Sequence, residues 1–308
     1  ANLTGGTLGV GTSITTTTVA PDGTTNIYLY YDRNEYTLTL EKNEYIETVT
    51  GAGTYKWGAT VAINATVKTN ITGYNASVWD KWTLTEGNGV TVPTTIKGNI
   101  VMTAGNITIV ANAVKGTPIT YSVVYNGNGA TGGTTASSTY TYDKAQNLTL
   151  NGYVRQYTVT FNGNYEGSTS QTAKSTYAFK DWNLKNDGTG NAYTNGQSVT
   201  NLTSTNNGTV TLYAMWDNTV SSAKLTLPTL TRANYVFEGW YKEQATTTLV
   251  GTAGNTYTPS GNITLYAKWS LANYSVTTKN GSYYFKTLAE AVAKADSDGS
   301  TITILQTN

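Results

Sequence analysis

The sequence predicts a mainly β protein (α+β overall) built as a series of small modules, with a short helix near its end. One observation is a repeated motif in which an aromatic residue, two further residues and a tryptophan precede a polar loop and a strand of alternating apolar residues. A second is the abundance of Thr, Tyr, Val, Ile, Gly and Asn, which favours strands and turns over helices. Such repeats usually serve reach, spacing or multivalent contact rather than a single active site.

The motif occurs three times, and its aromatic side chains are expected to form most of each core. Each ring buries roughly 150–250 Å², a large share of the apolar surface of a small module. We favour core packing over the alternative of an exposed sugar-stacking platform. The motif residues are Trp79, Trp82, Phe179, Trp182, Trp216, Phe237, Trp240 and Trp269.

Turn signals and alternating strands divide the chain into five segments. The first resembles the second half of a module, because a Pro-Asp-Gly turn precedes an alternating strand. Three modules follow, the second with a long insertion or additional half-unit at 119–156, and the last segment begins a different domain. The five segments are 1–35, 36–116, 117–217, 218–270 and 271–308.

Within each module, an opening strand and a closing strand alternate apolar and polar residues. The expected opening strands are 36–42, 121–129 and 224–228, and the second of these has a close copy at 157–164. The expected inward residues of the closing strands are Ile107, Ile109, Ala111 and Ala113; Val210, Leu212, Ala214 and Trp216; and Ile263, Leu265, Ala267 and Trp269.

The last segment predicts a partial ββαβ unit. A hairpin turns at the Asn-Gly pair of residues 280–281, and Thr287 and Glu290 have the spacing of a capping box that opens a short helix. Leu288, Val292 and Ala295 fall on one side of that helix, and a strand follows it.

Composition excludes several functions. The net charge is +1 and no basic block occurs, so we expect no partner among nucleic acids. Without Cys or His, the chain has no thiol nucleophile, disulfide or imidazole base. Two Asp-Gly turns, at 187–190 and 296–299, lack the oxygen ligands of a calcium loop. We therefore expect no cofactor, no metal, no catalytic residue and no enzyme activity, and no apolar run is long enough for membrane insertion.

The paired motifs resemble the Listeria–Bacteroides repeat, also called the internalin-type B-repeat. Phe237–Tyr241 with 263–269 is a close match, and Phe179–Trp182 with 210–216 is similar. Residues 36–113 resemble a divergent form, with Trp in place of the Phe and Ala in place of the last Trp. The resemblance covers about 36–269. It implies tandem β-grasp-like modules in an elongated array, each a small sheet curled over a short helix or loop, without catalytic residues.

Four tyrosines alternate with inward residues and are candidates for ligand contact: Tyr28, Tyr30, Tyr213 and Tyr266. As cross-strand neighbours they would stabilise a sheet by about 0.2–1 kcal/mol per pair. Aromatic rows also make contact surfaces of low conformational entropy. We favour the structural role and keep ligand contact as the alternative.

The resemblance implies a non-catalytic extracellular repeat region of a bacterial surface protein, located at the cell surface or cell wall. We expect a stalk or adhesive segment whose partner is a host or bacterial surface protein or a glycan. One alternative is a subunit of a head-to-tail filament, because the half-module at 1–35 leaves open strand edges for self-association. Another is a carbohydrate-binding accessory region of an extracellular enzyme.

Overall fold

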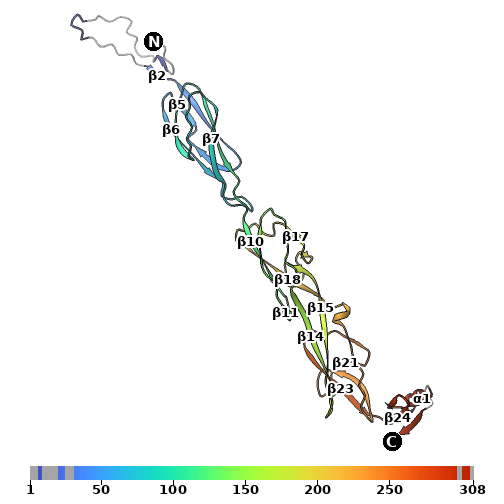
Figure 1. Cartoon of the computed structure of the whole chain (residues 1–308). Coiled ribbons are helices and arrows are strands. Elements are labelled where there is room, and N and C mark those ends of the chain that lie inside the picture. Colours follow the sequence, from blue (N-terminus) through green and yellow to red (C-terminus); the bar gives the residue numbers. More distant parts are fainter. Residues whose placement is uncertain (1–5, 9–19, 25–30, 297–299, 306–308) are drawn as a thin grey trace. The chain divides into compact units, whose positions relative to one another are not determined.

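The computed structural model describes residues 6–8, 20–24, 31–296 and 300–305 (Figure 1). Strands predominate, which confirms the mainly β class. The chain forms two compact units, one of residues 1–121, 139–144 and 200–208 and the other of residues 122–138, 145–199 and 209–308. Among the described residues, no helix is both apolar enough and long enough to cross a lipid bilayer.

The strands that precede the second repeat are short to medium in length. They are β1 (Gly6–Leu8), β2 (Tyr31–Arg33), β3 (Glu35–Lys42), β4 (Ile46–Thr50), β5 (Gly53–Lys56), β6 (Thr60–Val67), β7 (Val78–Glu86), β8 (Lys97–Val101) and β9 (Ile107–Val114). The next strands are β10 (Thr120–Asn126), β11 (Gly132–Gly133), β12 (Ser138–Thr141), β13 (Gln146–Asn147), β14 (Tyr153–Asn162), β15 (Gln171–Asn183), β16 (Ala192–Tyr193), β17 (Ser198–Val199) and β18 (Thr209–Asp217).

The remaining elements include both described helices. They are the 3₁₀-helix η1 (Ser221–Ala223), β19 (Leu225–Thr226), β20 (Tyr235–Tyr241), β21 (Leu249–Gly251), β22 (Thr256–Tyr257), β23 (Ile263–Leu271), β24 (Tyr274–Thr278), β25 (Gly281–Phe285), α1 (Leu288–Asp296) and β26 (Thr301–Ile304).

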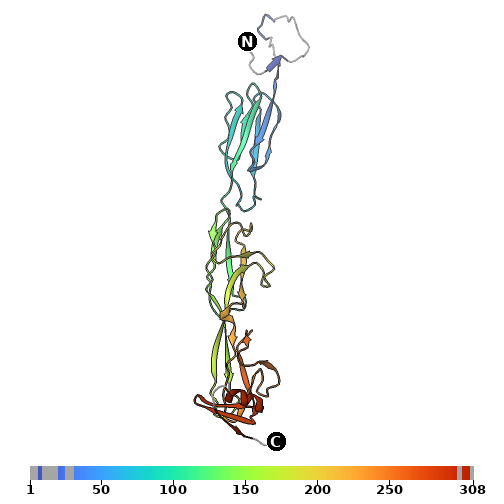
Figure 2. The same ribbon diagram turned by 90° about the vertical axis from the view of Figure 1, so that its right-hand side faces the viewer.

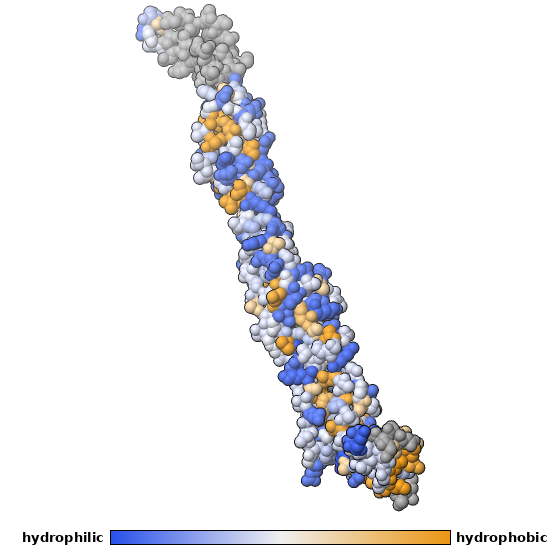
Figure 3. Space-filling model, turned by 45° about the vertical axis from the view of Figure 1, so that its right-hand side comes forward, coloured by the Kyte–Doolittle hydropathy of each residue, from blue (hydrophilic) through white to orange (hydrophobic). Residues whose placement is uncertain are grey.

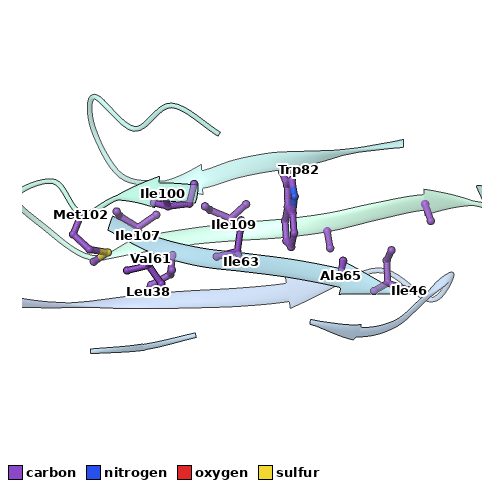
Figure 4. Close-up of a cluster of buried hydrophobic side chains, with 12 residues drawn as sticks. Leu38, Ile46, Val61, Ile63, Ala65, Trp82, Ile100, Met102, Ile107 and Ile109 are labelled. Carbon is purple, nitrogen blue, oxygen red and sulfur yellow. The ribbon is translucent and has the colours of Figure 1, made fainter. Parts of the chain in front are cut away.

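The first repeat is a sandwich of two sheets. The main sheet has the order β5-β3-β9-β7, and a smaller sheet of order β4-β6-β8 faces it. Alternation of apolar and polar residues gives each sheet one buried face. Figure 4 shows Trp82 standing between the two layers, close to Ile63 and Ile109. Ile107, Ile109, Ala111 and Ala113 are all buried, as the alternation in the sequence predicts.

The opening and closing strands of each repeat run parallel and side by side. In the first repeat β3 pairs with β9, beginning at Leu38 opposite Ile107. In the same register, β10 pairs with β18 and β14 pairs with β23. Parallel neighbours need a crossover connection, and here the rest of the repeat supplies it.

The second and third repeats exchange strands. The opening strand of the third repeat is β14, which lies in sequence before the closing strand of the second. The expectation that 224–228 opens the third repeat is therefore wrong, because among the described strands β19 in this stretch pairs only with the short β22. The true opening strand of the third repeat is the copy at 157–164, most of which lies in β14. Its length and alternation let it pair with β23.

β15 joins the second and third repeats. Its first half, from Gln171 to Tyr177, pairs with β14, and its second half, from Ala178 to Asn183, pairs with β18. The main sheet of this unit thus contains the continuous order β10-β18-β15-β14-β23-β20-β21. In place of a helix, two-stranded sheets accompany the main sheet: β13 with β17 and β19 with β22.

The elements β24, β25, α1 and β26 form a C-terminal subdomain (Figure 2). Its sheet has the order β25-β24-β26, and α1 packs on it through Ala291 and Ala295. Thr287 and Glu290 exchange hydrogen bonds at the start of α1, which confirms the capping box. Leu288 and Val292 are exposed, so the buried side of the helix is made of small residues. Apolar side chains gather on the surface of this subdomain (Figure 3).

Replacing Trp82 by Ala is expected to destabilise the first unit by about 3–5 kcal/mol, because it leaves a large void between the two sheets. Thermal unfolding followed by circular dichroism measures the effect. Val114→Ala, at a side chain that is 52% exposed, is the control and should stay within about 0.5 kcal/mol of the native protein. Equal shifts for the two variants would show that Trp82 does not support the core.

Candidate functional site

Each aromatic-x-x-Trp motif lies on a β-bulge. In a regular strand, residues three apart point to opposite faces of the sheet. The register shifts between Trp79 and Lys81, and at the matching positions in β15 and β20, so that one residue is left unpaired. The extra residue returns both aromatic side chains to the same face. The three-residue spacing of the motif is therefore the spacing that a bulge requires.

The bulge brings the two rings of each motif into edge contact. The ring centroids lie 5.4 Å apart for Trp79 and Trp82, 5.0 Å apart in the second motif and 5.3 Å apart in the third. Opposite the second ring of each motif the closing strand places a fully buried alanine, which leaves room for the indole. These alanines are Ala111, Ala214 and Ala267.

Burial differs within the motif. Trp82, Trp182 and Trp240 are buried, with at most 3% of their surface exposed. The other motif residues are half-buried and lie at the rim of each core: Trp79, Phe179, Trp216, Phe237 and Trp269. In the first repeat Trp79 pairs with Ala113, whereas Phe pairs with Trp in the other two repeats. A large residue thus faces a small one where the sequence departs from the pattern.

An asparagine ties the end of each opening strand to the closing strand. The side-chain nitrogen of Asn43 donates a hydrogen bond to the carbonyl oxygen of Ala113 over 2.7 Å. Asn128 donates to Ala214 over 3.0 Å, and Asn164 donates to Ala267 over 3.1 Å. When the parallel strand pairs of the three repeats are aligned by register, these three asparagines occupy equivalent positions. We call them the end ties.

The last tryptophan of the closing strand closes the same corner. The indole nitrogen of Trp216 donates to the carbonyl oxygen of Gly127 over 3.0 Å, and that of Trp269 donates to Gly163 over 2.7 Å. Asn128 and Asn164 follow these glycines with positive φ angles of 46° and 58°. Asn tolerates this left-handed backbone better than most residues. The Asn-Gly-Asn sequence therefore joins the end of the opening strand to the closing strand through side-chain hydrogen bonds.

Two further asparagines tie the start of the strand pair. The side-chain oxygen of Asn106 accepts a hydrogen bond from the backbone N–H of Thr37, and Asn262 accepts one from Thr158. The second repeat has Thr209 at this place. Sequence reasoning explained these asparagines as turn residues and did not assign them this role. The available signal was the recurrence of Asn directly before Ile-Thr in two closing strands.

The candidate ligand-contacting tyrosines divide into two groups. Tyr28 and Tyr30 lie outside the described residues. Tyr213 and Tyr266 are half-buried and occupy equivalent positions in β18 and β23, beside Asn126 and an equivalent asparagine of the opening strand. The structure does not bring Tyr213 and Tyr266 into a ring contact. Each lies separately on the sheet, beside an asparagine of the neighbouring strand.

One ion pair joins the third repeat to the C-terminal subdomain. The carboxylate of Glu238, the bulged residue of the motif, pairs with the ammonium group of Lys286 and accepts a 2.5 Å hydrogen bond from Ser270. Both interactions favour the charged form, and they lower the pKa of Glu238 from its usual 4.5, with Lys286 the larger cause. Among the described residues, no group of three or more acidic side chains could hold a metal ion.

Asn164→Asp is expected to lower stability by about 1–3 kcal/mol. It removes the donor that serves Ala267 and Gln244 and sets a carboxylate against two carbonyl oxygens. Asn207→Asp is the control, because Asn207 shares the positive φ but its side chain makes no hydrogen bond among the described residues. Urea unfolding compares the two. If Asn164→Asp loses no more stability than the control, the end tie does not stabilise the fold.

The Glu238–Lys286 pair should make the junction between the third repeat and the C-terminal subdomain sensitive to acid. Because the folded-state pKa of Glu238 is depressed, its contribution is present above the usual 4.5 and is lost as the pH falls through the folded-state pKa. The melting temperature of the native protein should therefore fall more steeply below pH 4.5 than that of Glu238→Gln. Glu44→Gln, at an exposed glutamate without such partners, should follow the native curve. Parallel curves for native and Glu238→Gln would contradict this assignment.

Comparison with known protein families finds one similarity, in the second and third repeats. Residues 170–215 and 204–268, which contain the second and third aromatic motifs and their closing strands, match the model of the Listeria-Bacteroides repeat domain. No curated protein and no solved structure matched the chain. Repeats of this family are found in bacterial surface and extracellular proteins, which indicates an extracellular repeat region. Residues 170–268 of this chain are thus similar to the Listeria–Bacteroides repeat domain.

Proposed function

We propose that this chain is a non-catalytic, load-bearing stalk of a bacterial surface protein, displayed at the cell surface or cell wall, where it supports or provides adhesion. The observation that carries the proposal is the parallel pairing of opening and closing strands in all three repeats. The chain enters each pair at the start of one strand and leaves at the end of the other. Tension along the chain therefore pulls the two strands past each other.

Sliding two paired strands loads their hydrogen bonds together, whereas peeling them apart loads one bond at a time. In the first repeat, five residue pairs from Leu38 opposite Ile107 to Lys42 opposite Ala111 share the load. The ties from Asn43 and Asn106 hold both ends of this ladder. Forced unfolding is governed by the unfolding rate, which such an arrangement slows.

The second and third repeats share one load path. β10, β18, β14 and β23 all point in the same direction, and β15 runs between them in the opposite direction. Force applied at the start of β10 and at the end of β23 loads every ladder between these two strands in the same sliding geometry. The shared strands β14 and β15 let neither repeat open while the other stays intact.

A non-catalytic role is supported by the state of the acidic groups. Every carboxyl with a resolved shift has a lowered pKa, and the groups responsible are chiefly nearby threonine, asparagine, lysine or tyrosine donors. A general acid needs a raised pKa, typically from burial beside a like charge. Asp187 and Asp217, for example, each accept two hydrogen bonds from a threonine two residues later, which is turn chemistry.

Filament formation stays a prediction, since it depends largely on residues 1–35, most of which lie outside the described part of the chain. An accessory carbohydrate-binding role is favoured by one observation, an aromatic cleft beside the third repeat.

Single-molecule force measurements test the load-bearing role. Because the chain has no cysteine, handles can be attached at introduced ones. Glu35→Cys with Val114→Cys places the handles at the start of β3 and at the end of β9, so the pair must slide. Glu44→Cys with Val114→Cys places both handles at the same end, so the pair peels. We expect a severalfold higher unfolding force in the first geometry. Equal forces in the two geometries would refute the proposal.

A further inference from the structure

A cleft of about 330 Å³ lies between the third repeat and β25 of the C-terminal subdomain. This volume is at the lower end of the range for small-molecule sites. Aromatic rings line both walls: Tyr235 and Phe237 on the side of the repeat, and Tyr283 and Tyr284 on the side of β25. Tyr283 is 37% exposed, and the ammonium group of Lys294 lies 4.4 Å from the centroid of its ring.

Arg232 supplies a cation to the wall of the cleft. Its guanidinium carbon lies 3.7 Å from the ring centroid of Tyr235 and 4.6 Å from that of Tyr165, so two rings fix its position. No carboxylate lies within ion-pair distance of Arg232 in the described part of the chain. The guanidinium fork is thus pre-oriented and free to bind a carboxylate with two parallel hydrogen bonds.

The acidic residue of the cleft does not compete for this cation. Glu238 is already paired with Lys286 and hydrogen-bonded to Ser270. The charge of Arg232 is therefore not compensated by Glu238. Hydroxyl groups of Thr229, Thr231 and Ser282 complete the lining, and they can donate to or accept from ligand hydroxyls.

We propose that this cleft binds a carboxylated sugar, such as a uronic acid or a sialic acid at the end of a glycan. The apolar face of a sugar ring fits against a tyrosine, its hydroxyls suit the threonine and serine side chains, and its carboxylate pairs with Arg232. A neutral sugar lacks the anion, and an acidic peptide lacks the stiff ring with hydroxyls around it. The assignment names a ligand for the adhesive role but does not depend on the load-bearing one, so the force and binding experiments fail independently.

Titration calorimetry with the whole chain tests the proposal, using glucuronic-acid-terminated and sialic-acid-terminated oligosaccharides, each with its neutral counterpart. We expect one of the acidic sugars to bind at least about tenfold more tightly than its neutral counterpart, with weaker binding at high salt. Which acidic sugar binds distinguishes the two sources of the carboxylate. No saturable binding of either acidic sugar, or equal affinity for acidic and neutral sugars, would overturn the proposal.

Two arginine variants localise the binding. Arg232→Gln should abolish the preference for the acidic sugar. Arg155→Gln is a matched control, because Arg155 also lies near two tyrosine rings, at 5.2 Å and 5.8 Å from their centroids, but does not line the cleft. It should bind like the native chain. Equal losses in the two variants would contradict the assigned site.

Two further experiments keep the site testable whatever the fate of Arg232→Gln. Tyr283→Ala removes a partly exposed ring, so its fold is expected to survive, and it should weaken binding of the acidic sugar. Unchanged binding in this variant would count against the cleft. Competition by an oligoglutamate peptide as strong as by the acidic sugar would show a general anion site and would also overturn the sugar assignment.

Discussion

The parallel pairing of the first and last strands of each repeat is the constraint on which the rest of the structure depends. These strands are far apart in sequence: the bond from Thr37 to Asn106 spans 69 residues, and that from Thr158 to Asn262 spans 104. Bringing such distant segments together costs loop-closure entropy before any contact offsets it. The asparagine ties and the indole bonds lie at the ends of this ladder, and the bulged aromatic pair lies on the strand that flanks the closing strand on its other side. Together these contacts offset that cost.

The three repeats solve the same packing problem with different side chains. The second and third use Phe and Trp across the closing strand, and the first uses Trp79 and Ala113. The end tie in the first repeat comes from Asn43 and reaches Ala113 instead of the buried alanine two residues earlier. The Trp–Ala pair of the first repeat is smaller than the Phe–Trp pairs of the other two, so the rim of the core differs in size among the repeats.

Much of the fold could be predicted from the sequence, because strand alternation and burial are local properties. The inward residues of β9, such as Ile107 and Ile109, follow from alternation alone. The opening strand of the third repeat could not be found this way, because parallel partners are chosen by long-range register, and a nearer stretch, 224–228, looked equally suitable. The bulge under each aromatic pair was also missed. Alternation assumes a regular strand, and only the odd spacing from Phe237 to Trp240 shows that the strand is not regular.

The candidate site was less predictable than the fold. The asparagine ties depend on which carbonyl each amide reaches, and composition shows only that Asn is frequent. The cleft beside Arg232 arises where β20 and β25 approach each other, a contact between segments that share no repeat pattern. Sequence reasoning named exposed tyrosines on the closing strands, whereas the cleft uses tyrosines from β20 and β25.

The shared hairpin of β14 and β15 bears on how such a chain can be lengthened or shortened in evolution. Excising 218–270 would remove β23 and leave β14 without its parallel neighbour. The first half of β15 pairs with β14, so its pairing would be weakened as well. Gene duplication that copied only one aromatic motif would likewise produce a strand without its parallel neighbour. For this part of the chain, the heritable building block is the interlocked pair of repeats.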